Sequence, residues 1–164
     1  MTRAYIGAGS NLGDRAAMLA KARDRLCANR FILFRKSSRV YETEPSGFLP
    51  QGMFLNAVWE LESDLPPEAL LRELLAAERF LYRARAFSAG PRTIDLDLLD
   101  FGGRLSVSKA LVLPHPRLHR RLFVLRPLCD VNPEWIHPLY QLSAQELLRR
   151  LVHPRNKLAV HTAR

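Results

Sequence analysis

The sequence predicts an α+β domain in which helices pack on one face of a mostly antiparallel sheet. The periodic segments follow one another in the order strand, helix, strand, strand, helix, strand, without an internal repeat. The length of 164 residues suits one domain. Apolar residues make up 48% of the chain and charged residues 25%, which is typical of a globular protein with a packed core.

The first half of the chain supplies the first strand, the first helix and a second strand. Residues 3–9 are an apolar run, and residues 11–28 then carry apolar side chains near helical spacing. Residues 31–41 mix apolar and basic side chains, which indicates a strand. Residues 42–52 contain two prolines and two glycines, so we expect a loop of a length that is often functional.

Two further strands and a helix follow. Residues 53–61 favour a strand, and leucines at helical spacing after Pro66 and Pro67 predict a helix that ends near Leu81. A basic loop is expected over 82–91, and a strand over 93–101 ends at a pair of glycines.

The last part of the chain predicts less regular structure. Residues 114–125 indicate a loop with a short helix, and residues 143–151 a last helix capped by Ser143. The basic tail, 153–164, is expected to fray, so the predicted domain is 1–152.

Charge and cysteine content narrow the classes of function. Lys and Arg number 25 against 16 acids, a net charge of +9, and all but four of the basic residues are arginine. Arginine suits bidentate contact with phosphate or carboxylate, so an anionic partner is indicated, although a GC-rich genome would also inflate arginine. Cys27 and Cys129 cannot form a disulfide framework, no apolar run is long enough to span a bilayer, and no secretory signal opens the chain. We expect a cytoplasmic protein.

The strongest chemical signal is an Asp-Leu-Asp sequence in the last predicted strand. Asp95 and Asp97 would point to one face of that strand, about 6.6 Å apart. Two such carboxylates repel each other unless a cation lies between them, and Mg²⁺ is commonly held by one or two carboxylates together with substrate phosphates. Arg83, Arg85 and Arg92 precede the pair. Acids for a metal beside arginines for phosphate indicate phosphoryl chemistry, although the acids could simply face water.

Other polar residues admit both a functional and a structural interpretation. Asn56 shares a strand face with Phe54 and could present a donor and an acceptor to a flat heterocycle, or lie at a sheet edge. Glu78 lies near the apolar face of its helix, where it would face a ligand or pair with an arginine. His115, between two prolines, could contact phosphate or be structural.

An ordered set of short motifs resembles the 6-hydroxymethyl-7,8-dihydropterin pyrophosphokinases, enzymes of folate biosynthesis. Each motif is weak alone, but their order and spacing together are specific, and they extend from Tyr5 to about Pro138. The motifs are Gly9-Ser10-Asn11-Leu12-Gly13; Tyr41, Thr43, Pro45 and Gly47; Phe54-Leu55-Asn56; Arg83 and Arg85; 90–97; Pro114-His115-Pro116-Arg117; and Arg121 with 123–125, Pro127 and Leu128.

The resemblance implies a ferredoxin-like α/β sandwich and a reaction in which ATP gives its pyrophosphoryl group to the pterin hydroxymethyl oxygen, leaving AMP. It gives a catalytic role to Arg83, Arg92, Asp95 and Asp97, and the two aspartates would hold two Mg²⁺ ions. It places ATP at Arg85, Arg92, Leu98, Val112, His115 and Arg121. It places the pterin at Thr43, Glu44, Ser46, Phe54, Asn56 and Phe123.

Two other classes of function stay open at this point. A basic α+β module could bind RNA through aromatics on its sheet, but no RNP-like segment is present. A two-metal nuclease could use the aspartate pair, but further acids and a base are not evident. Under the resemblance we expect a monomer that binds neither nucleic acid nor membrane.

Overall fold

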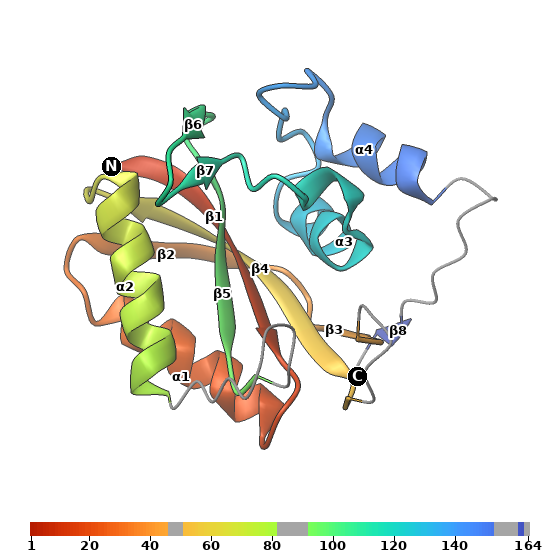
Figure 1. Cartoon of the computed structure of the whole chain (residues 1–164). Coiled ribbons are helices and arrows are strands. Elements are labelled where there is room, and N and C mark those ends of the chain that lie inside the picture. Colours follow the sequence, from red (N-terminus) through yellow and green to blue (C-terminus); the bar gives the residue numbers. More distant parts are fainter. Residues whose placement is uncertain (46–50, 82–91, 153–160, 163–164) are drawn as a thin grey trace.

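The structure is a computed structural model that describes residues 1–45, 51–81, 92–152 and 161–162. Within these residues the main sheet has six strands, and every pairing in it is antiparallel. The strands are β1 (Thr2–Ser10), β2 (Ile32–Ser37), β3 (Tyr41–Thr43), β4 (Phe54–Ser63), β5 (Asp95–Phe101) and β8 (His161–Thr162). β1 lies between β4 and β5, and β4 also pairs with β2 and β3 (Figure 1).

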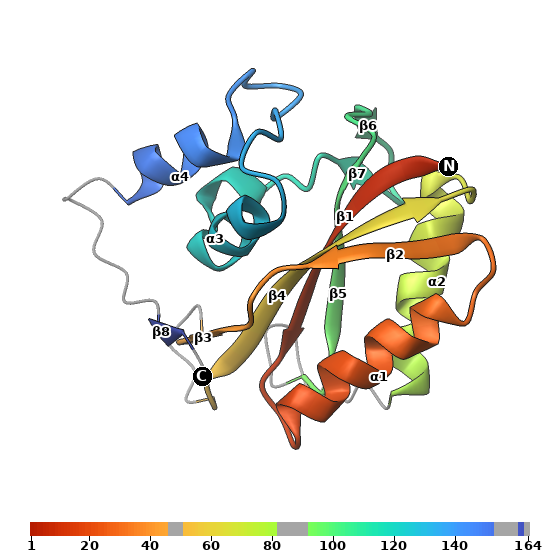
Figure 2. The same ribbon diagram turned by 180° about the vertical axis from the view of Figure 1, so that it is seen from behind.

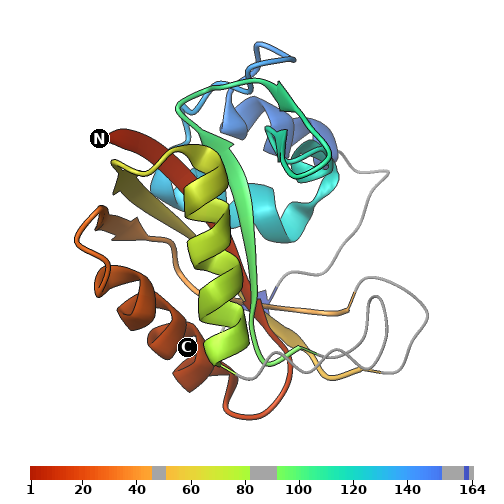
Figure 3. The same ribbon diagram turned by 60° about the vertical axis from the view of Figure 1, so that its left-hand side comes forward.

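Helices cover both faces of this sheet, not one face as the sequence predicts. Figures 1 and 3 show α1 (Arg15–Cys27) and α2 (Pro67–Phe80) side by side on one face. The opposite face carries α3 (Leu122–Val131), with α4 (Ala144–Leu151) packed beyond it. Each layer has its own core of buried side chains, so the sheet is a shared middle layer.

The third helix is longer than expected because its apolar face outweighs a proline. The predicted short helix ends at Leu125, but α3 continues through Pro127 to Val131. Pro127 removes one backbone hydrogen bond from the helix. Leu122, Leu125 and Leu128 recur at helical spacing and are all buried against the sheet, which compensates for that loss.

The single strand predicted for 31–41 is two strands in the structure. β2 and β3 both run along β4, with a bend between them (Figure 2). Ser38 lies at the bend, where its backbone N–H donates to the Val58 carbonyl at 2.9 Å and its hydroxyl accepts from the Val58 N–H at 2.9 Å. The Ser38 hydroxyl thus accepts the hydrogen bond from Val58 that a backbone carbonyl would accept in a continuous strand. β3 also extends to Thr43, which shortens the expected loop.

Other expectations agree closely with the structure. The helix after Pro66 is α2, with Pro67 in its first turn, and Ser143 caps α4 through a reciprocal capping box with Glu146. A small hairpin, β6 (Ser106–Val107) and β7 (Val112–Leu113), follows β5. Among the described residues, no helix combines the length and apolar character that crossing a membrane requires.

Candidate active site

A cavity of about 300 Å³ lies on the sheet face that carries α3. Residues from β1, β3, β4, β5 and the start of α3 line it, together with the turn around His115. Its walls therefore come from segments far apart in the sequence, which the antiparallel pairing of the sheet brings together.

Two glycines form the floor of this cavity. Gly7 and Gly9 alternate along β1, so both face α3, and β1 lies between β4 and β5. Gly9 is paired with Asn56 on β4 and with Asp95 on β5. A Cβ atom on Gly9 would lie only 2.9 Å from the Asn56 Oδ1 atom. The missing side chains thus leave room for a ligand between the residues that β4 and β5 contribute. Sequence reasoning missed this floor, although glycine inside a strand signals close approach.

One side of the cavity is acidic and is balanced by cations. Asp95 and Asp97 project from the same face of β5, as predicted, and both line the cavity. Asp95 is bound by the Arg92 guanidinium, and Asp97 lies 3.4 Å from the Arg121 Nη1 atom and 4.0 Å from the His115 Nε2 atom. Burial, and then the charge of Asp95, raise the pKa of Asp97. The nearby basic groups lower the pKa of Asp97, but by less than burial and Asp95 together raise it.

Burial and neighbouring charges also shift the pKa values of the basic groups around Asp97. Burial lowers the pKa of His115, and the nearby Arg121 and Arg117 add to the effect although Asp97 opposes it. Burial and Arg117 also lower the pKa of Arg121. These basic groups, whose positive charge burial and mutual repulsion disfavour, form a site suited to an anion with several charges.

The position of Arg92 is set by the turn after β1. The Asn11 Oδ1 atom accepts from the Arg92 N–H at 2.7 Å, and the Asn11 N–H donates to the Arg92 carbonyl at 3.1 Å. The Asn11 side chain also donates to Gln51 and Gly52. This buried asparagine therefore joins the turn after β1 to Gln51 and Arg92, which both line the cavity, a role that its place in the motif 9–13 does not predict.

The other side of the cavity combines aromatic and amide groups. Phe54 and Asn56 line it from β4, Thr43 from β3 and Phe123 from α3. Asn56 is nearly buried, and its Nδ2 atom donates to the Thr43 hydroxyl at 2.7 Å, which fixes the direction of the amide. A flat ring held between the aromatic groups would meet this amide at its edge.

The structure brings most of the predicted site residues into this cavity. The lining includes Thr43, Glu44, Phe54, Asn56, Arg92, Asp95, Asp97, His115, Arg121 and Phe123. Leu98 does not face it, because its side chain is 4% exposed and packs in the core on the α1 and α2 side. Val112 lies on β7 and is not among the lining residues. Ser46, Arg83 and Arg85 lie outside the described residues.

Glu78 binds the backbone of the strand that carries the acidic pair, a contact that the sequence does not predict. It is 1% exposed on α2, and its Oε1 atom accepts from the backbone N–H of Leu96 at 2.8 Å. Leu96 stands between Asp95 and Asp97, so this bond attaches the acidic segment of β5 to α2 from behind the cavity. The carboxylate is a structural support for the strand that carries the acidic pair.

Replacing Glu78 by alanine is expected to lower the free energy of unfolding by about 1–3 kcal/mol, because the Leu96 N–H loses its acceptor. Glu78→Gln keeps an acceptor oxygen and should lose less. Urea unfolding followed by circular dichroism measures both. Equal losses in the two variants would contradict the hydrogen-bonding role.

The acidic pair fits a magnesium ion that comes with phosphate ligands. Across the part of the chain that the structure describes, no group of three or more His, Cys, Asp or Glu side chains is placed to hold a metal alone. Mg²⁺ is usually bound by one or two carboxylates, with water and substrate phosphates completing its shell. Asp95 and Asp97 supply that donor set, and the raised pKa of Asp97 indicates a place where added positive charge is favourable.

Comparison with known sequences gives a consistent result. A family model described as 7,8-dihydro-6-hydroxymethylpterin-pyrophosphokinase (HPPK) matches residues 5–133. The 2-amino-4-hydroxy-6-hydroxymethyldihydropteridine pyrophosphokinase of Aquifex aeolicus is 38% identical over 146 residues, which is 89% of this chain and 90% of the relative. The protein of the same name from Methylorubrum extorquens is 43% identical over 136 residues, covering 83% of this chain and 86% of the relative.

Longer proteins also contain a matching segment. The folic acid synthesis protein fol1 of Pneumocystis carinii is 38% identical over 148 residues, and this chain spans only 20% of its length. Among solved structures, an HPPK-DHPS in complex with substrates superposes with a TM-score of 0.72 at 14% identity, covering 92% of this chain and 43% of that one. A Plasmodium falciparum HPPK-DHPS gives a TM-score of 0.73 at 13% identity, with 92% and 43% coverage. These structural matches support the fold.

Proposed function

Because the chain belongs to the 7,8-dihydro-6-hydroxymethylpterin-pyrophosphokinase family, we propose that it transfers the β,γ-pyrophosphoryl group of Mg²⁺-bound ATP to the hydroxymethyl group of 6-hydroxymethyl-7,8-dihydropterin. The products are AMP and the pterin diphosphate, and the step belongs to folate synthesis. One observation carries the proposal. A cavity has a paired-carboxylate and arginine side on β5 and an aromatic and amide side on β4, with only glycine between them.

The distance between these two sides suits the reaction. Asn56 and Asp95 both pair with Gly9, so their strands are separated by two inter-strand spacings, about 10 Å. A pterin ring stacked by Phe54 and Phe123, with its edge on Asn56, would point its hydroxymethyl group toward the acidic side. Such fixed placement of two substrates is a large part of catalysis in group transfer.

The chain's own residues would act on the phosphates. Asp95 and Asp97 would hold Mg²⁺, two ions in our proposal, and the metal would neutralise phosphate charge and lower the pKa of the hydroxyl. Arg92 and Arg121 then exchange their carboxylate partners for phosphate oxygens that carry developing charge. His115, whose neutral form burial favours, would donate or accept one hydrogen bond to a phosphate without adding charge.

The remaining assignments complete the proposal. Arg83 would assist the transfer beside Arg92, with Arg85 on the nucleotide and Ser46 on the pterin. Because the Leu98 side chain packs in the core, any nucleotide contact there would use its backbone. Val112, which is exposed on β7, would also contact the nucleotide. We further propose a cytoplasmic monomer that binds neither nucleic acid nor membrane, with 1–152 as the catalytic domain.

The direct test is a product assay. Purified protein with ATP and MgCl₂ should form AMP only when 6-hydroxymethyl-7,8-dihydropterin is added, and chelation of the metal should stop the reaction. The matched control replaces the dihydropterin by a pterin without the hydroxymethyl group. AMP formation at the same rate without the dihydropterin would overturn the proposal, as would cleavage of an added oligonucleotide.

The amide of Asn56 offers a test of the pterin side. Asn56→Ala should weaken pterin binding by about 1–3 kcal/mol, because the polar edge of the buried ring loses its partner. Affinity for an ATP analogue, measured without pterin, should change little, since Asn56 lies on the opposite side of Gly9 from the acids. Isothermal titration calorimetry measures both affinities. The reverse pattern would place the pterin elsewhere.

A further inference from the structure

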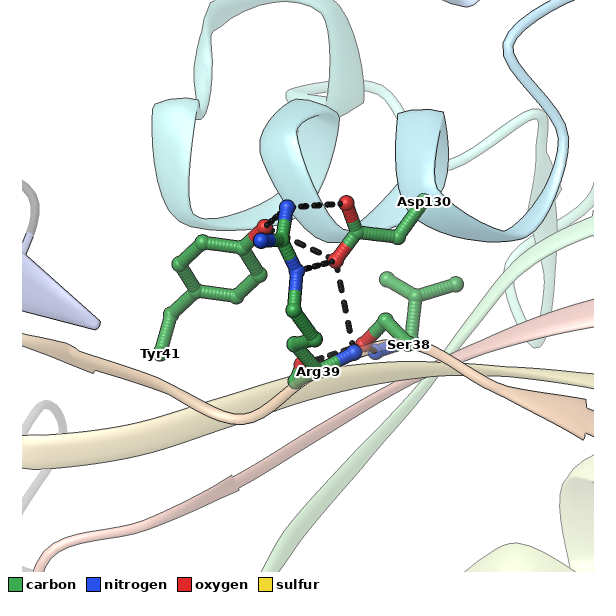
Figure 4. Close-up of polar contacts among 5 residues, drawn as sticks. Ser38, Arg39, Tyr41 and Asp130 are labelled. Carbon is green, nitrogen blue, oxygen red and sulfur yellow. Dashed lines mark hydrogen bonds and ion pairs between the residues drawn. The ribbon is translucent and has the colours of Figure 1, made fainter. Parts of the chain in front are cut away.

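A polar network joins the far end of α3 to the strand that leads into the cavity. Asp130 on α3 accepts from the Arg39 Nη2 atom at 2.8 Å and from its Nε atom at 3.1 Å. The same carboxylate accepts from the Tyr41 hydroxyl at 2.7 Å, and the Arg39 Nη2 atom donates to that hydroxyl at 2.9 Å. Figure 4 shows Asp130 pointing from the helix to both residues. We call Arg39, Tyr41 and Asp130 the α3 clamp.

The burial of Tyr41 determines how its hydroxyl takes part in the clamp. Tyr41 is 1% exposed, so its hydroxyl needs a partner inside the protein. Burial, and then the bond to Asp130, raise the pKa of Tyr41, which keeps the hydroxyl a donor. Burial alone would raise the pKa of Asp130, but the hydrogen bonds from Arg39 and Tyr41 lower it, so the acceptor stays ionised. Hydrogen bonds to an ionised acceptor are among the stronger ones in proteins.

Each end of the clamp lies on an element that also lines the ligand cavity. On the sheet, Tyr41 pairs directly with Asn56, and Thr43, which binds the Asn56 amide, lies two residues further on the same face. On the helix, Asp130 is seven residues, or two turns, after Phe123, so both project from nearly the same side of α3. Phe123 on α3 and Asn56 on β4 therefore line the same cavity from two separate elements.

A second contact shows that this end of α3 is held at several points. The Lys36 ammonium donates to the Val131 carbonyl at 2.9 Å, where a positive charge also favours the C-terminal end of a helix. At the other end, the side chain of the N-cap residue Arg121 makes no capping hydrogen bond and pairs with Asp97 instead. The described contacts thus fix α3 to β3 through the clamp and to β5 through Arg121.

We propose that the α3 clamp is a positioning device for the pterin subsite, which sets the distance between Phe123 on α3 and Asn56 and Thr43 on the sheet. Arg39, Tyr41 and Asp130 touch neither substrate; they act through the helix and the strand that carry the contacts. The inference rests on the proposed function, because it assigns a role in binding the same pterin. It goes further by naming residues outside the cavity that set its width.

Two conservative variants test this role. Tyr41→Phe removes only the hydroxyl, and Asp130→Asn keeps the shape of the side chain. Each should raise the KM for the dihydropterin about tenfold, the range expected when a coupled network is loosened, with kcat within about twofold. The affinity for an ATP analogue without pterin should stay within about twofold, since Asp97 still holds Arg121. The double variant should lose less than the two single losses combined, because both remove one interaction.

Glu62→Gln is the matched control, because the ion pair that it breaks joins Arg35 on β2 to Glu62 on β4 and includes no residue of α3. It should leave both KM values unchanged at a similar loss of stability. If the clamp variants change the pterin KM no more than Glu62→Gln does, or weaken the ATP analogue equally, the inference is wrong while the proposed function stands. A wild-type protein without pterin-dependent AMP formation would overturn the proposed function, and the inference with it.

Discussion

Replacing Asp97 by asparagine is expected to abolish turnover and, at the same time, to stabilise the ligand-free protein. The two effects share one cause. Burial and the neighbouring Asp95 raise the pKa of Asp97, so its ionised form is costly until a cation binds. An amide removes this cost but no longer offers a charged ligand to Mg²⁺. Loss of such a stabilising charge interaction lowers kcat by at least about a hundredfold.

The pH dependence of stability separates this explanation from a general packing effect. A carboxyl group whose pKa is raised by folding destabilises the folded state as pH rises from its unfolded pKa, about 3.9, through its folded pKa. The gain from Asp97→Asn should therefore be absent below about pH 4 and should grow as pH rises through the raised folded-state pKa of Asp97. Thermal unfolding of both proteins across this range measures it. A variant that keeps more than a tenth of wild-type activity at saturating Mg²⁺ would contradict the metal role.

Asp95→Asn tests the other member of the pair. It should abolish turnover as well, because the proposed Mg²⁺ site needs both carboxylates and the substrate phosphates to complete its shell. Its effect on stability differs in origin, since it also removes the acceptor of the Arg92 guanidinium. Activity at rising Mg²⁺ concentration is the measurement. Recovery of full kcat at high Mg²⁺ would limit Asp95 to a role in metal affinity.

The parts of the site that sequence reasoning predicted are those that depend on local periodicity. Asp95 and Asp97 share a face because alternate residues of a strand do, and the same rule places Phe54 with Asn56. Leu98, one residue beyond Asp97, points to the other face by the same rule, and its assignment to ATP came from the family resemblance rather than from periodicity.

The parts that it missed depend on long-range pairing. No local pattern places Asn11 against Arg92, or Asp130 against Tyr41, because these partners are 81 and 89 residues apart. The end of α3 was predicted wrongly for a different reason. Pro127 is a local signal against a helix, and burial of the α3 apolar face against the sheet, which a single segment does not reveal, outweighs it.

Replacing Arg92 by alanine is expected to lower kcat by about a hundredfold to a thousandfold, the usual cost of removing one preorganised charge-stabilising group. The backbone of residue 92 should stay in place, because Asn11 holds it through both its N–H and its carbonyl. The KM for the pterin should change little, since Arg92 lies on the acidic side of the cavity.

Arg92→Lys shows whether charge alone is sufficient. Lysine keeps the positive charge but lacks the planar pair of donors that fits a phosphate, so it should recover only part of the lost kcat. Arg35→Ala is the control, because Arg35 pairs with a glutamate at the surface of the sheet and is not among the residues that line the cavity. Steady-state assays at saturating ATP and pterin measure all three variants.

Unlike Asp97→Asn, Arg92→Ala should not stabilise the ligand-free protein, because it removes a cation from beside two carboxylates and leaves their repulsion less balanced. Full activity of Arg92→Lys would mean that this position needs a charge but not a guanidinium, and an unchanged kcat in Arg92→Ala would remove the residue from the transfer step.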